Sequence, residues 1–515
     1  MSRISHPDYQ NAGPKTSSLG DGDASETEST AHPAKAGASA ESRIIVSNIL
    51  SLGSGEIVAR LIAFLGSAYL ARRLEPAGFG MISFAAALFG YLALGVTAGF
   101  NDVGAREVAR RPQDASSIAA SVILLRTVLA CFALAALGVL VWFLHKPPTL
   151  KLVIVLMGFS LFSLALDTSW AYKGLERSFP VSIALVVGQV LFVGLVLVFV
   201  KGPEDVAIVP VAQFVGEIAA ALLLLVPILR TGKVRLDIRE GLKLLRSSGL
   251  RTVTRILRTL IFTFDLVLIG FLLGERQVGL YSAPYRICFL FVAIAVTVHV
   301  SYMPALSRAF KQGPMAISDV ARRSMGISAA IAAPMVVGGA LLAAPLLQTF
   351  FGLEYVEGAN AFRLLLLSIG LIFIHSTIYN LLLVSDLLRI EVGITAFAAA
   401  VNIVLVLMLV PRYGIVGAAF CTAVAEGIVL LMGLTITHRR GITFNVRYLV
   451  RPILAAGLMG IVLVLMGSGH SLLLYLPIGV MTYLLALIIL RGVPEDAQPF
   501  LHNMTAFASG LRGRG

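Results

Sequence analysis

Long apolar stretches separated by short polar loops fill the chain between Arg43 and Arg491. A helix that crosses a bilayer needs about 20 predominantly apolar residues, and fourteen stretches have roughly that length. The predicted spans are 46–70, 79–100, 118–144, 152–172, 179–199, 206–229, 253–273, 281–303, 325–351, 362–384, 390–409, 415–437, 448–466 and 472–490. The runs are continuous and do not alternate, which excludes a transmembrane β-barrel. We therefore predict an all-α polytopic membrane protein with about fourteen transmembrane helices.

The composition indicates that the apolar side chains of these spans face lipid. Of the 515 residues, 57% are hydrophobic and 13% are charged, about half the ~25% that is usual in soluble domains. The mean hydropathy of +0.89 excludes both a soluble globular protein and a disordered one. The three cysteines, which lie apart in apolar runs, indicate neither a metal site nor a required disulfide.

The positive charge of the chain is concentrated in alternate loops. The 41 Lys and Arg residues exceed the 28 acids and give a net charge of +13. No zinc-finger, homeodomain or RNP-type pattern accompanies this surplus, so we expect no nucleic-acid partner. The even-numbered loops hold twenty Lys and Arg and the odd-numbered loops about seven. The positive-inside rule therefore predicts that the even loops and both termini are cytoplasmic.

Three segments outside the spans are predicted to be two cytoplasmic tails and one linker. Residues 1–42 are rich in small and polar residues and predict a disordered cytoplasmic tail, with no signal peptide. Residues 230–250 place apolar and basic side chains at helical spacing, which predicts a basic linker helix on the cytoplasmic membrane surface; a plain basic linker is the alternative. Residues 492–515 form a C-terminal cytoplasmic tail.

The chain also resembles itself. The sequence LEPAGFGMIS at 74–83 precedes LGERQVGLYS at 273–282 by 199 residues, and each lies between the first and second span of a half. A second pair, 206–210 with Glu217 and 415–419 with Glu426, is offset by 209 residues. We interpret this as two six-helix lobes, 43–229 and 251–438, related by a pseudo-twofold axis along the membrane normal, with two further helices in 439–491.

The seventh predicted span carries the densest intramembrane charge. Arg251, Arg255, Arg258 and Asp265 are spaced 4, 3 and 7 residues apart, which places them on one helix face. A charge within a span costs about 3 kcal/mol on insertion scales. We interpret the face as a cationic stripe along a cleft. Alternatively, Arg251 and Arg255 extend to the headgroups while Arg258 pairs with Asp265.

Other spans add further candidates. Glu56 and Arg60 are four residues apart and can pair with each other or contact a substrate. Arg126 lies near the cytoplasmic end of the third span, where it could extend to the interface, and Arg286 lies near the outer end of the eighth. Glu217 and Glu426 occupy equivalent positions of the repeat; they are ion sites or bond to neighbouring helices. His299 and His375 are interpreted as packed residues and not as ligands.

These residues predict a cavity that attracts anions. The substrate-binding candidates are Arg60, Arg126, Arg255, Arg258 and Arg286, and the candidates for ion coupling are Glu56, Glu217, Asp265 and Glu426. The cations outnumber the acids, and a low-dielectric wall focuses their field. Arginine suits phosphate because its fork bonds two oxygens at once. We assign no catalytic residue, metal or cofactor, and no P-loop motif for ATP is present.

Four stretches resemble the polysaccharide-biosynthesis (O-antigen flippase) family of the multidrug/oligosaccharidyl-lipid/polysaccharide exporter superfamily. They are ARRLEPAGFG at 71–80, NDVGAREVAR at 101–110, GLYSAPYR at 279–286 and YGIVGAA at 413–419. The resemblance covers roughly 43–491. The sequence departs from the family at Glu75, where Gly is usual, and in its long N-terminal tail.

The resemblance implies a transporter of the bacterial inner membrane and not an enzyme. It would flip an undecaprenyl-pyrophosphate-linked oligosaccharide across the membrane by alternating access, among membrane lipid and beside a polysaccharide polymerase and glycosyltransferases. A multidrug or cation antiporter and a flippase for another lipid-linked headgroup share the expected fold. A membrane glycosyltransferase or ligase is disfavoured because the odd loops are only about ten residues long or shorter.

Overall fold

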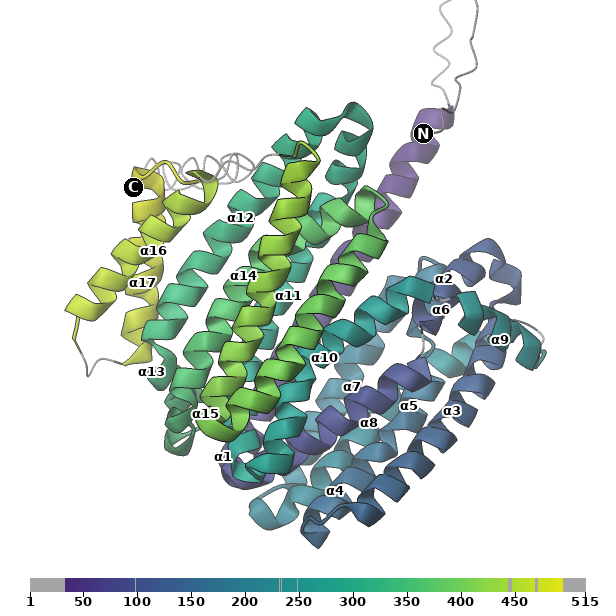
Figure 1. Cartoon of the computed structure of the whole chain (residues 1–515). Coiled ribbons are helices and arrows are strands. Elements are labelled where there is room, and N and C mark those ends of the chain that lie inside the picture. The colour runs from purple at the N-terminus through teal and green to yellow at the C-terminus, as the bar shows by residue number, and fades with distance from the viewer. Residues whose placement is uncertain are drawn as a thin grey trace, which may run out of the picture. The chain divides into compact units, whose positions relative to one another are not determined.

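A computed structural model describes residues 33–97, 99–230, 232, 234–247, 249–442, 447–467 and 471–493. Within these ranges the regular structure is entirely helical, as predicted (Figure 1). Residues 48–515 form one compact unit, and the arrangement given below is that of its described residues.

The helices follow the apolar stretches of the sequence. In the N-terminal half they are α1 (Pro33–Thr97), α2 (Phe100–Arg110), α3 (Ala115–Phe143), α4 (Pro148–Gly158), α5 (Ser160–Leu166), α6 (Ser169–Gly174), α7 (Ser178–Phe199), α8 (Ile208–Arg230) and α9 (Ile238–Ser247). In the C-terminal half they are α10 (Gly249–Leu272), α11 (Glu275–Gln312), α12 (Pro314–Leu341), α13 (Ala343–Phe350), α14 (Ala359–Val384), α15 (Leu388–Arg439), α16 (Arg447–Leu465) and α17 (Leu472–Ile489). Short 3₁₀ turns occupy Pro112–Asp114, Pro203–Ala207 and Leu353–Gly358.

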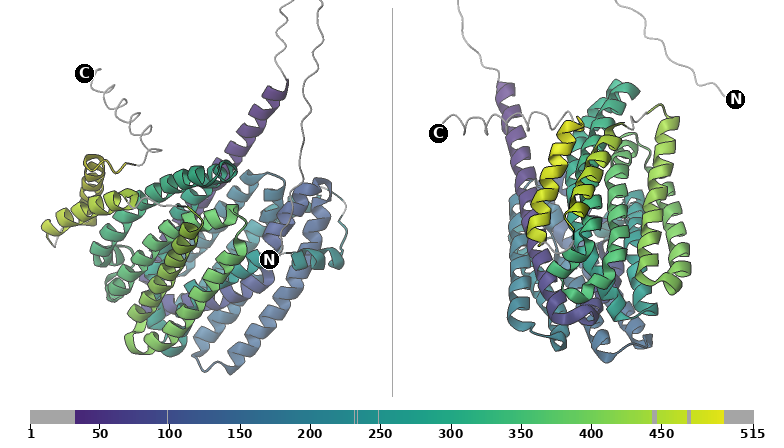
Figure 2. Two further views of the ribbon diagram at one scale, coloured as in Figure 1. Left: turned by 45° about the horizontal axis from the view of Figure 1, so that its top comes forward. Right: turned by 90° about the vertical axis from the view of Figure 1, so that its left-hand side faces the viewer.

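Every predicted span lies on helical structure. Eleven helical stretches in the described part of the chain are long and apolar enough to cross a membrane. Two of them, Gly55–Arg110 and Leu388–Arg439, contain most of α1 and all of α15. Each of these two helices covers two predicted spans and is interrupted by one non-helical residue, Glu75 in α1 and Gly414 in α15. The two legs of α15 lie side by side in both views (Figure 2), and α10 covers one more predicted span. The fourth span is correct in place but is broken into α4, α5 and α6.

The segments outside the spans agree only in part with their predictions. Residues 1–32 of the expected tail and residues 494–515 lie outside the described residues, whereas α1 already begins at Pro33. The linker contains the predicted helix, α9, which packs against α2 and α3. The lobe boundaries stay a prediction, and α16 and α17 pack against α12 and each other.

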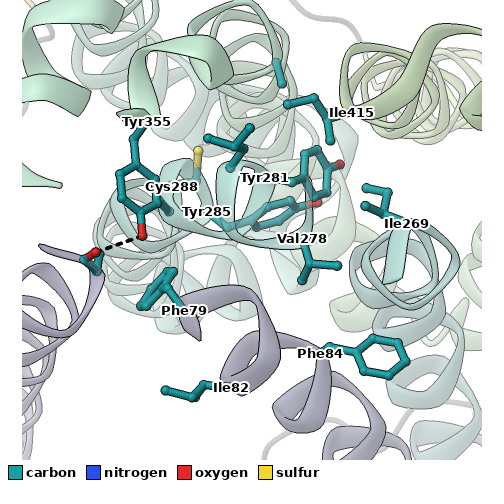
Figure 3. Packing of buried hydrophobic residues seen from close by; sticks show 14 of the residues in the cluster. Phe79, Ile82, Phe84, Ile269, Val278, Tyr281, Tyr285, Cys288, Tyr355 and Ile415 are labelled. Atoms are coloured by element: carbon teal, nitrogen blue, oxygen red, sulfur yellow. Dashed lines mark hydrogen bonds between the residues drawn. The ribbon is translucent and has the colours of Figure 1, made fainter. Parts of the chain in front are cut away.

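Because successive spans run in alternating directions, even and odd loops lie at different ends of the bundle. We call these the basic end and the opposite end. At the opposite end a single apolar cluster draws on both halves (Figure 3). Its members include Phe79, Leu137, Val196, Ile269, Tyr281, Phe351, Tyr355 and Ile415. The apolar clusters toward the basic end each draw on one half only.

Polar contacts between the halves also lie at the opposite end. Lys146 Nζ lies 3.0 Å from Glu275 Oε1 and donates to the Gly270 carbonyl at 2.8 Å. The Tyr355 hydroxyl donates to the carbonyl of Ala71 at 3.0 Å (Figure 3). The halves are therefore joined at this end by both apolar packing and hydrogen bonds.

A reciprocal backbone contact supports the internal repeat. A Cβ atom added to Gly80 would lie 1.8 Å from the Glu275 carbonyl oxygen, and one added to Gly279 would lie 1.8 Å from that of Pro76. Gly80 and Gly279 correspond in the 199-residue alignment, and so do Pro76 and Glu275. Each half thus presents the same surface to the other, as an isologous twofold contact requires.

The residue that starts the second helix of each half has the same unusual backbone. Glu75 has φ 58° and ψ 174°, and its counterpart Gly274 has φ 87° and ψ 175°. This region of conformational space is almost confined to glycine. The departure from the family pattern at Glu75 is therefore a strained position.

Replacing Glu75 by glycine should relieve this strain. We expect Glu75→Gly to raise stability by about 1 kcal/mol or more, and Gly274→Glu to lower it by a similar amount. The midpoint of thermal unfolding in detergent measures both. A lower midpoint for Glu75→Gly would contradict the strain.

The glycine contact gives a second prediction. Gly80→Ala or Gly279→Ala forces two helix backbones apart, and overpacking of this kind costs about 1–3 kcal/mol. Gly90→Ala is the matched control, because a Cβ at that position of α1 meets no atom within 4 Å; it should be neutral or slightly stabilising. Equal unfolding midpoints for Gly80→Ala and Gly90→Ala would refute the contact.

Candidate functional site

A cavity of about 1080 Å³ lies toward the basic end. Its walls come from α10, α11 and α14, with Asp102 of α2 and Leu388 of α15. The lining extends from Arg258, in the middle of α10, to Lys311, in the last turn of α11. We call this space the large cavity.

Arg258 lies in the large cavity, as the sequence indicates. Its guanidinium is 3.1 Å from Glu391 Oε1 and stacks 5.3 Å from the ring centre of Tyr379. The alternative that Arg258 pairs with Asp265 is therefore wrong, because Glu391 of α15 takes this role. Arg251 and Arg255 belong to α10, but their side chains lie outside the described residues.

Two cations, one acid and two imidazoles line the large cavity. Arg258 and Lys311 face Asp102, and the imidazoles of His299 and His375 also contribute to the lining. Lys311 is exposed, and we find no ion-pair partner for it among the described side chains. The cavity thus offers one paired and one unpaired cation.

A buried histidine–carboxylate pair forms part of the wall. The ring Nε2 of His375 donates to Glu426 Oε2 at 2.6 Å, and their side chains are 2% and 0% exposed. His375 Nδ1 and Glu426 Oε1 have no hydrogen-bond partner among the described residues. Glu426 therefore bonds to a neighbouring helix, one of the two alternatives for this residue. His299, in contrast, is held by Ala295, Ser328 and Thr377.

Asp265 does not line the large cavity, and hydrogen-bond donors surround its carboxylate. The hydroxyls of Tyr281, Tyr285 and Thr422 donate to Oδ2, and the Leu266 N–H donates to Oδ1. The carboxyl group is completely buried. The predicted continuous stripe from Arg251 to Asp265 along one cleft is therefore wrong at its deep end, because α11 and α15 enclose Asp265.

A second, smaller cavity of about 530 Å³ lies within the N-terminal half. It brings together Glu56, Arg60 and Glu217, which the sequence singled out. Arg60 lies 2.5 Å from Glu56 Oε1, which is the self-pairing that the four-residue spacing indicates. Ser163 donates to Glu217 Oε2 at 2.6 Å, and Gln213 donates to Oε1 at 2.8 Å. We call this space the small cavity.

Arg126 does not extend to the membrane interface, so that prediction is wrong. Its side chain is fully buried and donates to Asn101 Oδ1 at 2.6 Å and to the Asp167 carbonyl at 3.2 Å. The rings of Phe100 and Trp170 flank the guanidinium at 5.5 and 5.9 Å. Asn101 belongs to α2, and Asp167 lies just before α6. These tertiary contacts provide the hydrogen-bond acceptors that lipid headgroups would have provided at the interface.

Arg286 lies far along α11 from Lys311, on the side of the opposite end. Its guanidinium is 5.8 Å from the ring centre of Phe79, and it lines neither of the two cavities described above. The four predicted arginines whose side chains are described, Arg60, Arg126, Arg258 and Arg286, are therefore not brought together, and the side chain of Arg255 lies outside the described residues. Arg258 lines the large cavity and Arg60 the small one, whereas Arg126 and Arg286 pack elsewhere.

The structure adds site residues that the sequence does not distinguish. Lys311 is one of the many positive charges of the even-numbered loops, and Glu391 lies at the start of an apolar span, where a residue at the membrane interface is also expected. Asp167 and Lys173 line the small cavity but fall at the edge of a predicted span. No cluster of three or more His, Cys, Asp or Glu side chains that could hold a metal occurs within the described ranges.

Comparison with known proteins gives relatives for sequence and for fold. Over 231 residues the chain is 24% identical to a protein of Escherichia coli (strain K12) that carries the name of an O-antigen transporter; the match covers 43% of this chain and 55% of that one. It is also 24% identical over 164 residues to a Haloferax volcanii protein that carries the name of a flippase, AglR, covering 31% and 34%. The chain thus spans about half the length of the first relative.

Solved structures share the fold. Lipid II flippase MurJ in an inward closed conformation matches with a TM-score of 0.69 at 16% identity, over 85% of this chain and 98% of that one. An inward-facing multidrug resistance MATE family transporter matches with a TM-score of 0.60 at 17% identity, over 75% and 96%. At such identities the likeness concerns the fold alone.

The family comparison covers more than half of the chain. Residues 45–310 match the family described as polysaccharide biosynthesis protein. This range includes α1, the helices of the N-terminal half, α10 and most of α11. The chain belongs to the polysaccharide biosynthesis protein family.

Proposed function

We propose that the protein flips a polyprenyl-(pyro)phosphate-linked oligosaccharide across a bacterial inner membrane. The observation that carries the proposal is the large cavity: a space of about 1080 Å³ toward the basic end in which Arg258 and Lys311 lie among apolar side chains, while both halves pack together at the opposite end. The name of one sequence relative, an O-antigen transporter, supports a glycan substrate, and the name of the other, a flippase, supports movement across the membrane.

The chemistry of the substrate explains the need for such a cavity. Each sugar hydroxyl that loses its hydrogen bonds in hydrocarbon costs a few kcal/mol, so a glycan does not cross a bilayer unaided. Arg258 and Lys311 can bind the phosphate oxygens, the sugars remain in the hydrated space, and the polyprenyl chain stays in lipid.

Alternating access supplies the movement. With the basic end in the cytoplasm, as the loop charges predict, the large cavity lies toward the side where the substrate is made. Opening of the opposite-end contacts and closure of the large cavity would release the headgroup on the other side. The partners in this scheme are the lipid-linked substrate, membrane lipid, and the glycosyltransferases and polymerase that make and use the glycan.

For ion coupling we propose Glu426, with His375 as its partner. Of the four predicted carboxylates, Glu56 pairs with Arg60, Glu217 lines the small cavity, and Asp265 is enclosed by hydroxyls. Glu426 bonds to an ionisable side chain that itself lines the large cavity. A proton taken up by this pair would change the charge of the cavity wall without a change in packing.

Removal of the cavity cations should impair transport. We expect Arg258→Gln or Lys311→Gln to slow flipping of a fluorescent polyprenyl-pyrophosphate oligosaccharide in proteoliposomes about 10- to 100-fold, because each loses a charged hydrogen bond to phosphate. Arg308→Gln, on the same helix but outside the cavity lining, is the control and should leave the rate unchanged.

The pair with Glu391 needs a separate control. If Arg258 served only to neutralise Glu391, the double variant Arg258→Gln/Glu391→Gln would recover the rate. We expect no recovery, and a full recovery would remove Arg258 from the substrate site.

Coupling at Glu426 predicts a loss of response to a pH gradient. Glu426→Gln should retain flipping at equal pH on both sides of the vesicle but lose any acceleration by an imposed gradient. Glu357→Gln, which breaks an exposed pair with Arg276 outside the lining of both cavities, is the control and should keep the acceleration. A Glu426→Gln variant that responds to the gradient as the unmodified protein does would disprove the assignment.

A further inference from the structure

The small cavity differs from the large one in charge. It is lined by three carboxylates, those of Glu56, Asp167 and Glu217, and by two cations, those of Arg60 and Lys173. Its formal balance is therefore negative, whereas the large cavity presents Arg258 and Lys311 against Asp102. Lys311, which has no ion-pair partner among the described residues, therefore favours a phosphate group in the large cavity, whereas the excess of carboxylates disfavours one in the small cavity.

The polar groups of the small cavity suit a ligand that both donates and accepts hydrogen bonds. Glu217 is held by the neutral donors Ser163 and Gln213 and has no ion-pair partner among the described residues, so each of its oxygens retains a lone pair for a further donor. Ser169 and the amide of Gln189 also line the space. The Gln189 amide oxygen has no hydrogen-bond partner among the described residues.

The cations argue against an organic cation as the ligand. Arg60 and Lys173 line the same space, and like charges disfavour a positively charged guest. A neutral polyhydroxyl group has no such conflict, because hydroxyls donate to the carboxylates and accept from the cations. The volume of about 530 Å³ lies within the ~300–1,000 Å³ of small-molecule sites, and Phe89 and Leu224 add apolar wall.

The walls of the two cavities are linked through Arg126. Asp102 lines the large cavity, and its neighbour Asn101 accepts a hydrogen bond from Arg126. Arg126 also donates to the carbonyl of Asp167, which lines the small cavity. A short chain of contacts in the N-terminal half therefore connects the two sites.

We propose that the small cavity is the glycan subsite of this transporter: it binds neutral sugar hydroxyls while the large cavity binds the phosphates. The proposal rests on the proposed function and adds a division of the substrate between the two halves. Arg126 is a positioning residue in this scheme, because it orients the wall and does not contact the ligand.

The test compares two lipids that differ only in the glycan. Binding of a polyprenyl-pyrophosphate oligosaccharide and of the sugar-free polyprenyl pyrophosphate to the purified full chain in nanodiscs is measured for Gln189→Leu and Glu217→Gln. We expect each variant to weaken binding of the oligosaccharide lipid about five- to tenfold, the effect of one lost hydrogen bond, and to leave the sugar-free lipid unaffected. Lys311→Gln should weaken both.

Val190→Ala, an exposed neighbour of Gln189 on α7, is the matched control and should change neither affinity. Retained binding of the sugar-free lipid shows that each variant is folded. Equal weakening of both lipids by Gln189→Leu and Glu217→Gln would assign the small cavity to phosphate and overturn the proposal. So would unchanged binding of both lipids.

Two further outcomes separate this proposal from the proposed function. If tetraphenylphosphonium binds, and Glu217→Gln abolishes that binding without an effect on the oligosaccharide lipid, the small cavity is a cation site and the glycan subsite is refuted. If the unmodified protein binds neither lipid, the proposed function itself fails, and the subsite fails with it.

Discussion

The arrangement of this protein depends on a backbone contact between its two halves. At Gly80 and Gly279 the halves meet without intervening side chains, each glycine facing a carbonyl of the other helix. Contact this close brings the start of the second leg of α1 and the start of α11 together and lets Phe79, Tyr281 and Tyr355 pack around them (Figure 3). Because the shared core lies at this end alone among the described clusters, space between helices remains toward the basic end.

The internal repeat, which the sequence shows only as two short similarities, has a physical origin in the contact between Gly80 and Gly279. A surface that packs against its own copy about a twofold axis needs the same small residue and the same turn on both sides. Gly80 and Gly279 each lie against a carbonyl group of the other half, and Glu75 and Gly274 have similar backbone angles. Glu75 shows that the turn is imposed by the tertiary contact, since its side chain does not favour it.

The sequence predicts the helices well because hydrophobicity along the chain directly reflects contact with lipid. It also places Arg258 correctly, since a charge in mid-span must find water or a partner. The sequence does not identify the partner of Arg258, because both Asp265 and Glu391 carry a carboxylate that could pair with it. The packing of α10 on α15 determines that the partner is Glu391. Likewise, no spacing links His375 to Glu426 or Arg126 to Asn101, because those contacts join helices distant in the chain.

The distribution of polar contacts agrees with a movement of one half against the other. The deeply placed polar groups discussed above find partners within their own half: Arg126 with Asn101, Glu217 with Ser163, Arg258 with Glu391 and His375 with Glu426. A buried charge that loses its partner is costly, so these pairs can persist only if each half moves as a unit. The contacts that join the halves, such as those of Lys146 with Glu275 and of Tyr355 with Ala71, lie at the opposite end. Water can replace the lost hydrogen-bond partners there, so these polar contacts cost less to break than an internal pair. The main cost of separating the halves at that end is exposure of the shared apolar cluster around Gly80 and Gly279.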